Sequence, residues 1–171
     1  MTWTAGNNNA NEAAKIRNEV VPFMRGVALD IGAGPYRVWP HFISVDSCKE
    51  WGRQGVDVVV ETAERLPLFA SASVDCCFSS HLLEHIKDYK AALKEWWRVL
   101  KPGGFLVLYL PDEDEYPKVG QIGANPDHKW NVNYDLVVEA MEEIPGSWDL
   151  IQYEKRSQAD EYSLFFVFAK L

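Results

Sequence analysis

Short apolar runs recur along the chain and have the character of β-strands. Residues 27–31 and 105–110 lack a strict alternation of apolar and polar positions, which is typical of parallel strands buried on both faces. Polar turn residues bound these runs and several similar ones. We expect seven strands, at residues 27–31, 42–45, 56–62, 74–80, 105–110, 148–153 and 162–169.

Apolar residues at helical spacing fall between the expected strands. They mark residues 11–24, 88–100 and 133–144, with Asp88 as the expected N-cap of the second helix and a turn at 102–104 after it. Strands that alternate with helices, followed by a closing hairpin, predict an α/β domain. Its sheet should be open, mostly parallel and seven-stranded, with an antiparallel C-terminal hairpin.

Length and composition favour one domain over residues 1–171, with residues 1–9 loosely held. The formal net charge of −8 argues against a nucleic-acid partner, because attraction to phosphates rests on lysine and arginine. No apolar run approaches the roughly 20 residues that a membrane helix needs. Cys48, Cys76 and Cys77 are odd in number, so we expect buried thiols and a reducing cytoplasm.

An acid and two glycines end the first strand, in the sequence Val27-Ala28-Leu29-Asp30-Ile31-Gly32-Ala33-Gly34. The glycines let the backbone turn sharply and approach a ligand. Asp46 ends the second strand, where a carboxylate can accept hydrogen bonds from a ribose diol. Glycine-rich turns after strands are also common where no nucleotide binds, so the loop alone leaves both interpretations open.

The carboxyl ends of parallel strands meet at one edge of a sheet, and ligands bind at that edge near the point where strand order reverses. Polar residues gather at these ends repeatedly, and we therefore expect one site there. The groups concerned are Asp30 with Gly32 and Gly34, Asp46 with Ser47, and residues 61–64, 79–81 and 110–112.

Four motifs in order resemble those of class I S-adenosylmethionine-dependent methyltransferases, of the type 11-like, small-molecule group. The match covers roughly residues 27–111 and implies a Rossmann-like doubly wound fold with S-adenosylmethionine as cofactor. The motifs are the loop from Asp30 to Gly34, Ala63-Glu64-Arg65-Leu66-Pro67-Leu68, the block from Val74-Asp75 to Leu83-Glu84-His85-Ile86, and Trp97-Arg98-Val99-Leu100-Lys101-Pro102-Gly103-Gly104.

The resemblance implies roles at the methionine and ribose parts of the cofactor. Gly32 and Gly34 would pack against the methionine part, and Asp30 would orient its amino group directly or through water. Asp46 would hold the ribose hydroxyls. The alternative is that Asp46 binds no ligand and is simply a surface acid at the end of a strand.

The resemblance further implies that Ala63 and Glu64 border the adenine, with a backbone N–H available to a ring nitrogen. Ser79 and Ser80 would face the methionine end. Both serines could equally be turn residues, so their role stays open.

Three features depart from the family pattern. Tyr36 stands where a third glycine is usual, and the two prolines in residues 35–41 exclude a normal crossover helix, so we expect an irregular loop packed by Tyr36 and Trp39. Thr62 replaces an acid that often contacts adenine, and we expect Glu61 on the other side. The links on either side of the third strand are short, which predicts trimmed crossover helices.

The long loop over residues 111–131 is a candidate substrate lid. A sulfonium methyl is already activated, so an in-line nucleophile and a general base suffice for transfer. The candidate bases are His81, Asp112, Asp127 and His128. We favour His128 with Asp127 nearby, and a solvated loop histidine is the common alternative.

We expect methyl transfer from S-adenosylmethionine to an oxygen or nitrogen of a small polar acceptor, such as a sugar or related metabolite. One alternative is a non-catalytic cofactor-binding or interaction domain with the same fold. A nicotinamide-dependent oxidoreductase is disfavoured, because a third glycine and a Tyr/Lys or Cys/His arrangement are missing. We expect no metal site from His81 with His85 or from the cysteines, no membrane partner, and room for a homodimer.

Overall fold

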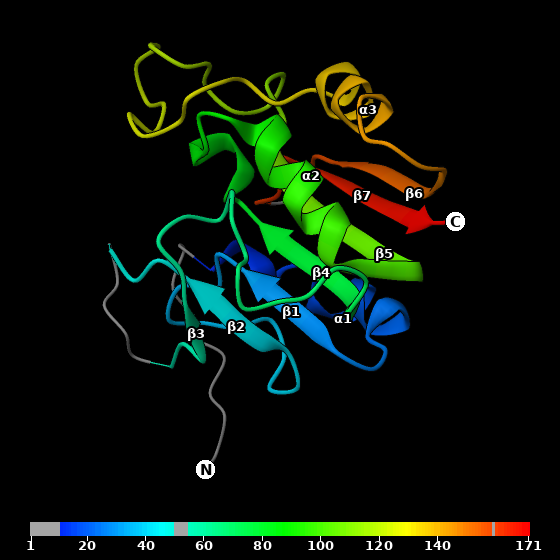
Figure 1. The fold of residues 1–171 in the computed structure, drawn as a ribbon. Coiled ribbons are helices and arrows are strands. Elements are labelled where there is room, and N and C mark those ends of the chain that lie inside the picture. The colour runs from blue at the N-terminus through cyan, green and yellow to red at the C-terminus, as the bar shows by residue number, and fades with distance from the viewer. Residues whose placement is uncertain (1–10, 50–54, 159) are drawn as a thin grey trace.

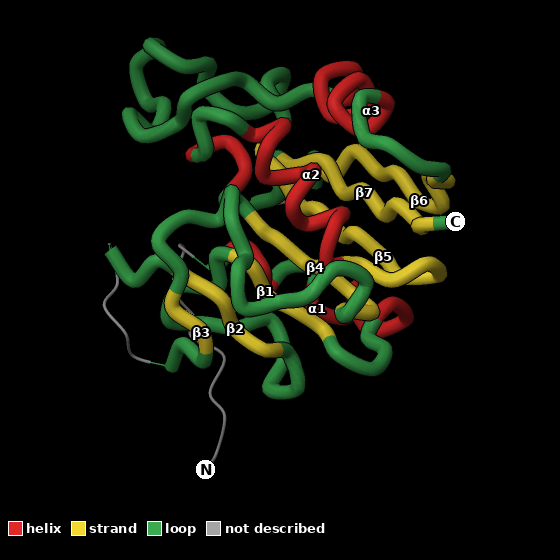
Figure 2. Tube along the Cα trace, in the orientation of Figure 1, coloured by secondary structure: helices red, strands yellow, loops and turns green. Residues whose placement is uncertain are grey.

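The computed structural model describes residues 11–49, 55–158 and 160–171, so the expectation for residues 1–9 lies outside it. Seven strands form one sheet in the order β3-β2-β1-β4-β5-β7-β6 (Figures 1 and 2). Neighbours from β3 to β5 pair in parallel, and β7 is antiparallel to β5 and β6. This confirms the predicted fold. The strands are β1 Ala28–Ile31, β2 Ile43–Asp46, β3 Val58–Val59, β4 Val74–Ser80, β5 Leu100–Pro111, β6 Trp148–Arg156 and β7 Ser163–Lys170.

Two helices, α2 (Tyr89–Val99) and α3 (Tyr134–Glu142), cover one face of the sheet (Figure 1). The backbone N–H of Ala91 donates to Oδ1 of Asp88 at 3.0 Å, which confirms Asp88 as the N-cap of α2. Both helices therefore begin and end close to where the apolar spacing predicts.

A segment of three short helical turns lies against the opposite face: η1 (Glu12–Ala14), α1 (Arg17–Val20) and η2 (Val21–Phe23). The prediction of one continuous helix over residues 11–24 is wrong. Pro22 carries no N–H and cannot donate to the carbonyl of Asn18, so the α-helix ends before it.

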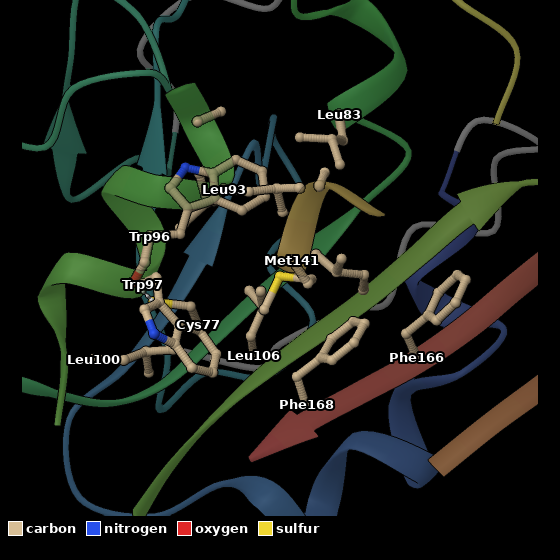
Figure 3. Packing of buried hydrophobic residues seen from close by; sticks show 14 of the residues in the cluster. Cys77, Leu83, Leu93, Trp96, Trp97, Leu100, Leu106, Met141, Phe166 and Phe168 are labelled. Atoms are coloured by element: carbon tan, nitrogen blue, oxygen red, sulfur yellow. Dashed lines mark hydrogen bonds between the residues drawn. The ribbon is translucent and has the colours of Figure 1, made fainter. Parts of the chain in front are cut away.

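The core has two layers because successive strand residues point to opposite faces of the sheet. Cys77 packs in the layer under α2 and α3 with Trp96, Leu106 and Phe168 (Figure 3). Cys76 packs in the other layer, with the apolar residues of the N-terminal turns. All three cysteines are free. Cys76 and Cys77 are buried as expected, whereas Cys48 is only half-buried, which corrects the expectation for that residue.

The strand boundaries differ most from the prediction at β3 and β5, and β6 continues to Arg156 instead of ending at residue 153. β3 has two residues instead of the span 56–62, and Val59 remains 40% exposed at the edge of the sheet, where one side of the strand has no partner strand among the described residues. β5 begins at Leu100, so the turn expected at residues 102–104 lies within it as an irregularity of its pairing with β4. Gly103 has a φ of +79° at that point.

The connection from β1 to β2 contains no helix, and neither does the one from β3 to β4, as the prolines and short links predict. Within the described residues, no helix has the length and apolar character needed to span a membrane. The carboxyl ends of β1, β2 and β4 point toward the same side of the molecule (Figure 1). That side carries the site.

Candidate functional site

The glycine loop after β1 is fastened to the end of β2. The N–H of Gly32 donates to the carbonyl of Val45 at 2.8 Å, and the N–H of Gly34 donates to Oδ2 of Asp46 at 2.9 Å. Gly32 has a φ of +78°, and a Cβ there would lie 2.6 Å from Cδ2 of Leu82. Only glycine therefore fits this turn without a shift of its neighbours.

Asp30 is buried beneath this loop and holds the irregular link that follows it. Its Oδ2 accepts a hydrogen bond of 2.6 Å from the N–H of Val38. Burial raises the pKa of Asp30 to about 7, against the opposing effect of the Val38 hydrogen bond. Trp39 fastens the same link, because its indole N–H donates to the carbonyl of Arg17 at 2.7 Å.

Two cavities of about 290 Å³ each open along this edge of the sheet. We call them the first and second cavities, and Gly32, His81 and His85 line both. The first is otherwise lined by Asp46, Ser47, Lys49, Glu61, Thr62, Ala63, Leu82 and Ile86. The second is otherwise lined by residues 11–13, Asp30, residues 33–36, Ser80, Glu84, Tyr116, Asn125, His128 and Tyr162.

In the first cavity, Asp46 also accepts a hydrogen bond from the N–H of Cys48 at 2.7 Å, so backbone donors orient its carboxylate. Ala63 lines the cavity as predicted. Glu64 does not, because its carboxylate accepts a hydrogen bond of 2.6 Å from Oγ1 of Thr62. Glu61 lines the same cavity as Thr62, contrary to the expectation of opposite sides, since β3 ends at Val59 and strand alternation does not extend to them.

In the second cavity, the two adjacent serines of β4 differ. Ser80 lines the cavity, and its buried hydroxyl oxygen has no hydrogen-bond partner among the described residues. The Ser79 hydroxyl donates to the carbonyl of Ile31 at 2.9 Å and is buried away from both cavities. Of this predicted pair, the structure therefore brings Ser80 alone to the site.

The long loop reaches the site through its second half. The N–H of Lys129 donates to the carbonyl of Glu84 at 2.8 Å, and the indole N–H of Trp130 donates to the carbonyl of Leu83 at 3.1 Å. His128 is thereby held in the wall of the second cavity, 8% exposed. Asp127 is exposed and lines neither cavity, so of the two favoured residues only His128 lies in a cavity wall.

The groups that face His128 are Glu84 and His85, both from the short turn η3 (Leu83–His85). Nε2 of His128 lies 3.8 Å from Oε1 of Glu84, and the rings of His85 and His128 have centroids 4.8 Å apart. Nδ1 of His81 lies 3.6 Å from the same carboxylate oxygen. Four titratable side chains are thus gathered in one wall.

Burial dominates the electrostatics of this wall. It raises the pKa of Glu84 to about 8 and lowers the pKa of His128 to about 4, with His85 adding to the latter shift. It also lowers the pKa of His81 to about 3, and Lys15 adds to that shift. The uncharged forms of these groups are therefore favoured near neutral pH.

Sequence reasoning missed Glu84, Glu12 and Tyr162 as site residues. Glu84 carried a signal, since it is an acid within the apolar motif Leu83-Glu84-His85-Ile86. Glu12 and Tyr162 come from opposite ends of the chain, and the phenol donates to Oε1 of Glu12 at 3.3 Å. Only the folded sheet brings these two together, so no local pattern could have paired them.

Comparison with known sequences supports one family. Residues 36–108 match the family described as "Methyltransferase domain". A malonyl-[acyl-carrier protein] O-methyltransferase of Yersinia pestis is 30% identical over 112 residues, covering 64% of this chain and 37% of that protein. An uncharacterized 37.1 kDa protein of Streptomyces fradiae is 35% identical over 113 residues, covering 53% and 32%. The chain spans about a third of the length of these relatives.

Solved structures share the fold over nearly the whole chain. A SAM-dependent methyltransferase from Thermotoga maritima, described as a possible histamine N-methyltransferase, has a TM-score of 0.71 and 18% identity, covering 93% of this chain and 89% of its own. A SAM-dependent methyltransferase from Archaeoglobus fulgidus has a TM-score of 0.69 and 16% identity, covering 92% of both. At these identities the likeness concerns the fold alone.

Proposed function

We propose that this chain, which carries the domain of the class I S-adenosylmethionine-dependent methyltransferases, moves the methyl group of that cofactor to an oxygen or nitrogen of a small polar acceptor. The observation that carries the proposal is the pair of neighbouring cavities that share Gly32 in their walls. Asp46 lies in the first and Asp30 in the second. An elongated cofactor fits along both.

The chemistry of the cofactor assigns its two ends. A ribose diol donates two hydrogen bonds, and the carboxylate of Asp46 accepts such bonds while backbone N–H groups hold it in place. The adenine then lies against Thr62 and Ala63. The amino group at the methionine end is cationic and pairs with Asp30, and Ser80 offers a hydroxyl beside it.

The sulfonium methyl then faces the rest of the second cavity, where Tyr116, His128 and Tyr162 line the wall. A lone pair of the acceptor forms the new bond to the methyl carbon, the bond from carbon to sulfur breaks, and sulfur keeps its electron pair. The methionine end takes up part of the second cavity, whose volume is about 290 Å³, and the space that is left suits a small acceptor. In this arrangement His128 contacts the acceptor and Asp127 does not.

Calorimetric titration with S-adenosylmethionine and S-adenosylhomocysteine tests the cofactor site. We expect Asp46→Ala to weaken binding at least tenfold, roughly 1.4 kcal/mol, because the ribose loses its acceptor. Asp149→Ala is the matched control, since Asp149 is exposed on β6 and lines neither cavity. Equal affinity of the two variants would mean that the ribose is held elsewhere, and no binding of either ligand at millimolar concentration would contradict the proposal.

A screen of small hydroxyl- and amine-bearing acceptors separates an enzyme from a domain that only binds cofactor. The measured quantity is S-adenosylhomocysteine released per chain. We expect turnover with at least one polar acceptor. Cofactor binding without any turnover across the screen would favour the non-catalytic alternative.

A further inference from the structure

Three side chains with metal-ligating atoms converge in the wall of the second cavity: Glu84, His85 and His128. One such atom from each lies within 4.8 Å of the other two. Nε2 of His85 and Nε2 of His128 lie 3.9 and 3.8 Å from Oε1 of Glu84. Ligand atoms around a four-coordinate zinc ion lie about 3.4 Å apart, so an approach of at most about 1.4 Å between any two of these atoms completes the geometry.

Glu84 supplies a second and independent observation. Its side chain is 0% exposed, and neither carboxylate oxygen has a hydrogen-bond partner among the described residues. A buried carboxyl without partners is costly, and native proteins pair nearly all such groups. Because Glu84 lines the second cavity and its Oε1 lies near both histidines, a cation bound there would meet that oxygen.

The backbone holds the three side chains in place before any ligand arrives. Glu84 and His85 are neighbours in η3, and the loop is fastened to that turn by the hydrogen bonds from Lys129 and Trp130 described above. Trp130 also stacks on Tyr89, with ring centroids 3.9 Å apart. His128 is therefore fixed beside Glu84 by contacts that involve neither side chain. Such prior ordering is what a metal site requires of its scaffold.

We propose that Glu84, His85 and His128 bind one divalent first-row transition cation. Two imidazole nitrogens with one carboxylate oxygen suit Zn²⁺, Fe²⁺, Co²⁺ or Ni²⁺, whereas Mg²⁺ and Ca²⁺ take oxygen ligands. Three protein ligands leave a coordination position open, as in catalytic metal sites. That position faces the second cavity.

The open position also assigns a class of acceptor, and this step rests on the proposed function. An acceptor hydroxyl bound to the cation loses its proton to solvent more readily, and its oxygen then takes the methyl group from sulfur. Expansion of the cation from four ligands to five lets a second oxygen on the adjacent carbon bind as well and complete a chelate. The acceptor class is therefore a vicinal diol or an α-hydroxy acid.

Titration of the tag-free, chelator-treated chain with Co²⁺ and Zn²⁺ tests the site, by calorimetry and by the visible absorption of Co²⁺. We expect one equivalent per chain. Glu84→Gln and His128→Asn should each weaken binding at least about 100-fold. His41→Asn is the matched control, because His41 is exposed and lines neither cavity, and its affinity should equal that of the wild type.

Two further measurements keep the test decisive if a buried substitution unfolds the chain. His85 is a partly exposed ligand, so His85→Asn should weaken metal binding in a protein whose circular dichroism is unchanged. Acetohydroxamate, a bidentate oxygen chelator, should shift the Co²⁺ spectrum if the open position exists, and an unchanged spectrum would contradict it. Metal binding that is absent, or equal in His41→Asn and all three ligand variants, would overturn the proposal.

One further titration distinguishes failure of the metal-site proposal from failure of the proposed function. S-Adenosylhomocysteine is titrated into the same preparations without metal. Loss of that binding with metal binding intact contradicts the methyltransferase proposal and leaves the site standing. Cofactor binding without metal binding overturns the site alone.

Discussion

At the residue scale, Gly32 shows how one position joins backbone conformation to the site. Its φ is +78°, and a Cβ would approach Leu82 within 2.6 Å. We expect Gly32→Ala to lower the free energy of unfolding by about 2–4 kcal/mol, as the sum of a left-handed backbone and an overpacked contact. Chemical denaturation measures the change.

Gly120→Ala provides the matched control for that substitution. Gly120 has a φ of +86°, and nothing lies within 4 Å of its ideal Cβ, so this variant carries the backbone strain without the clash. We expect Gly120→Ala to lower the free energy of unfolding by about 1–2 kcal/mol. Equal losses in the two variants would show that Leu82 yields freely to a methyl group.

Asp30 predicts a pH dependence of stability. Its pKa is about 7 in the folded chain and 3.8 in the unfolded chain, so between these values the folded state binds the extra proton. The stability that Asp30 contributes is therefore complete below pH 3.8 and is lost as pH rises toward 7. The free energy of unfolding of Asp30→Asn, minus that of the wild type, should rise over this range, by on the order of 4 kcal/mol at most.

Urea denaturation of both proteins from pH 4 to pH 8 measures that difference, in which other titrating groups largely cancel. A difference that does not change with pH would contradict the raised pKa of Asp30. Binding of the cationic cofactor should also release protons below pH 7, because an ammonium group beside Asp30 favours its ionised form.

Single residues were predictable from the sequence where they end strands. Asp30 and Asp46 lie at the site because the carboxyl ends of β1 and β2 meet at one edge. The sequence did not predict which of Ser79 and Ser80 faces the cavity. That depends on the register in which β4 pairs with β1. The contact of His128 with Glu84 was not predictable either, because Glu84 comes from a turn that is distant in the sequence.

At the scale of elements, the loop over residues 111–131 depends on a small number of anchors. The indole N–H of Trp130 donates to Leu83, and its ring stacks on Tyr89. Trp130→Phe keeps a ring but removes the donor, which costs about 1 kcal/mol. We expect amide hydrogen exchange within the loop to accelerate about fivefold, as measured by mass spectrometry.

Trp148→Phe is the control for this experiment. The indole N–H of Trp148 likewise donates to a backbone carbonyl, that of Met141 at 3.1 Å, at the other end of the sheet. The Trp148→Phe substitution should leave amide hydrogen exchange in the loop unchanged. Equal acceleration in the two variants would mean that the loop responds to global stability and not to its own anchor.

Elements with a strong apolar pattern were predicted well, and weakly patterned ones were not. β4 has the predicted bounds, and α2 begins after its predicted cap. The N-terminal stripe predicted one helix, but Pro22 removed a donor that its spacing required. β3 is shorter than its valines indicate, because an edge strand gains pairing on one side only.

At the scale of the whole molecule, the sheet order explains how both cavities form although the crossover helices are short or missing. Strand order reverses between β1 and β4, and the loops that follow these strands carry Gly32 and His81. The missing crossover helix between β1 and β2 is replaced by a link that Asp30 and Trp39 hold. The cofactor has no pyrophosphate that would need a helix N-terminus, so this replacement is compatible with binding.

Glu12, Glu84 and Tyr162 meet in the wall of the second cavity because of the fold of the whole molecule, and no local sequence pattern predicts that they do. The sequence indicates which strands are parallel and which edge of the sheet carries the two cavities. It does not indicate which loop side chains meet above that edge, because their positions follow from tertiary packing of segments far apart in the chain.

A crystal structure of the chain with S-adenosylhomocysteine tests the central claim most directly. We predict that the ribose hydroxyls contact Asp46 in the first cavity, that the amino group lies beside Asp30, and that the sulfur faces the second cavity toward His128. A cofactor bound in the reverse direction, or outside both cavities, would contradict the account.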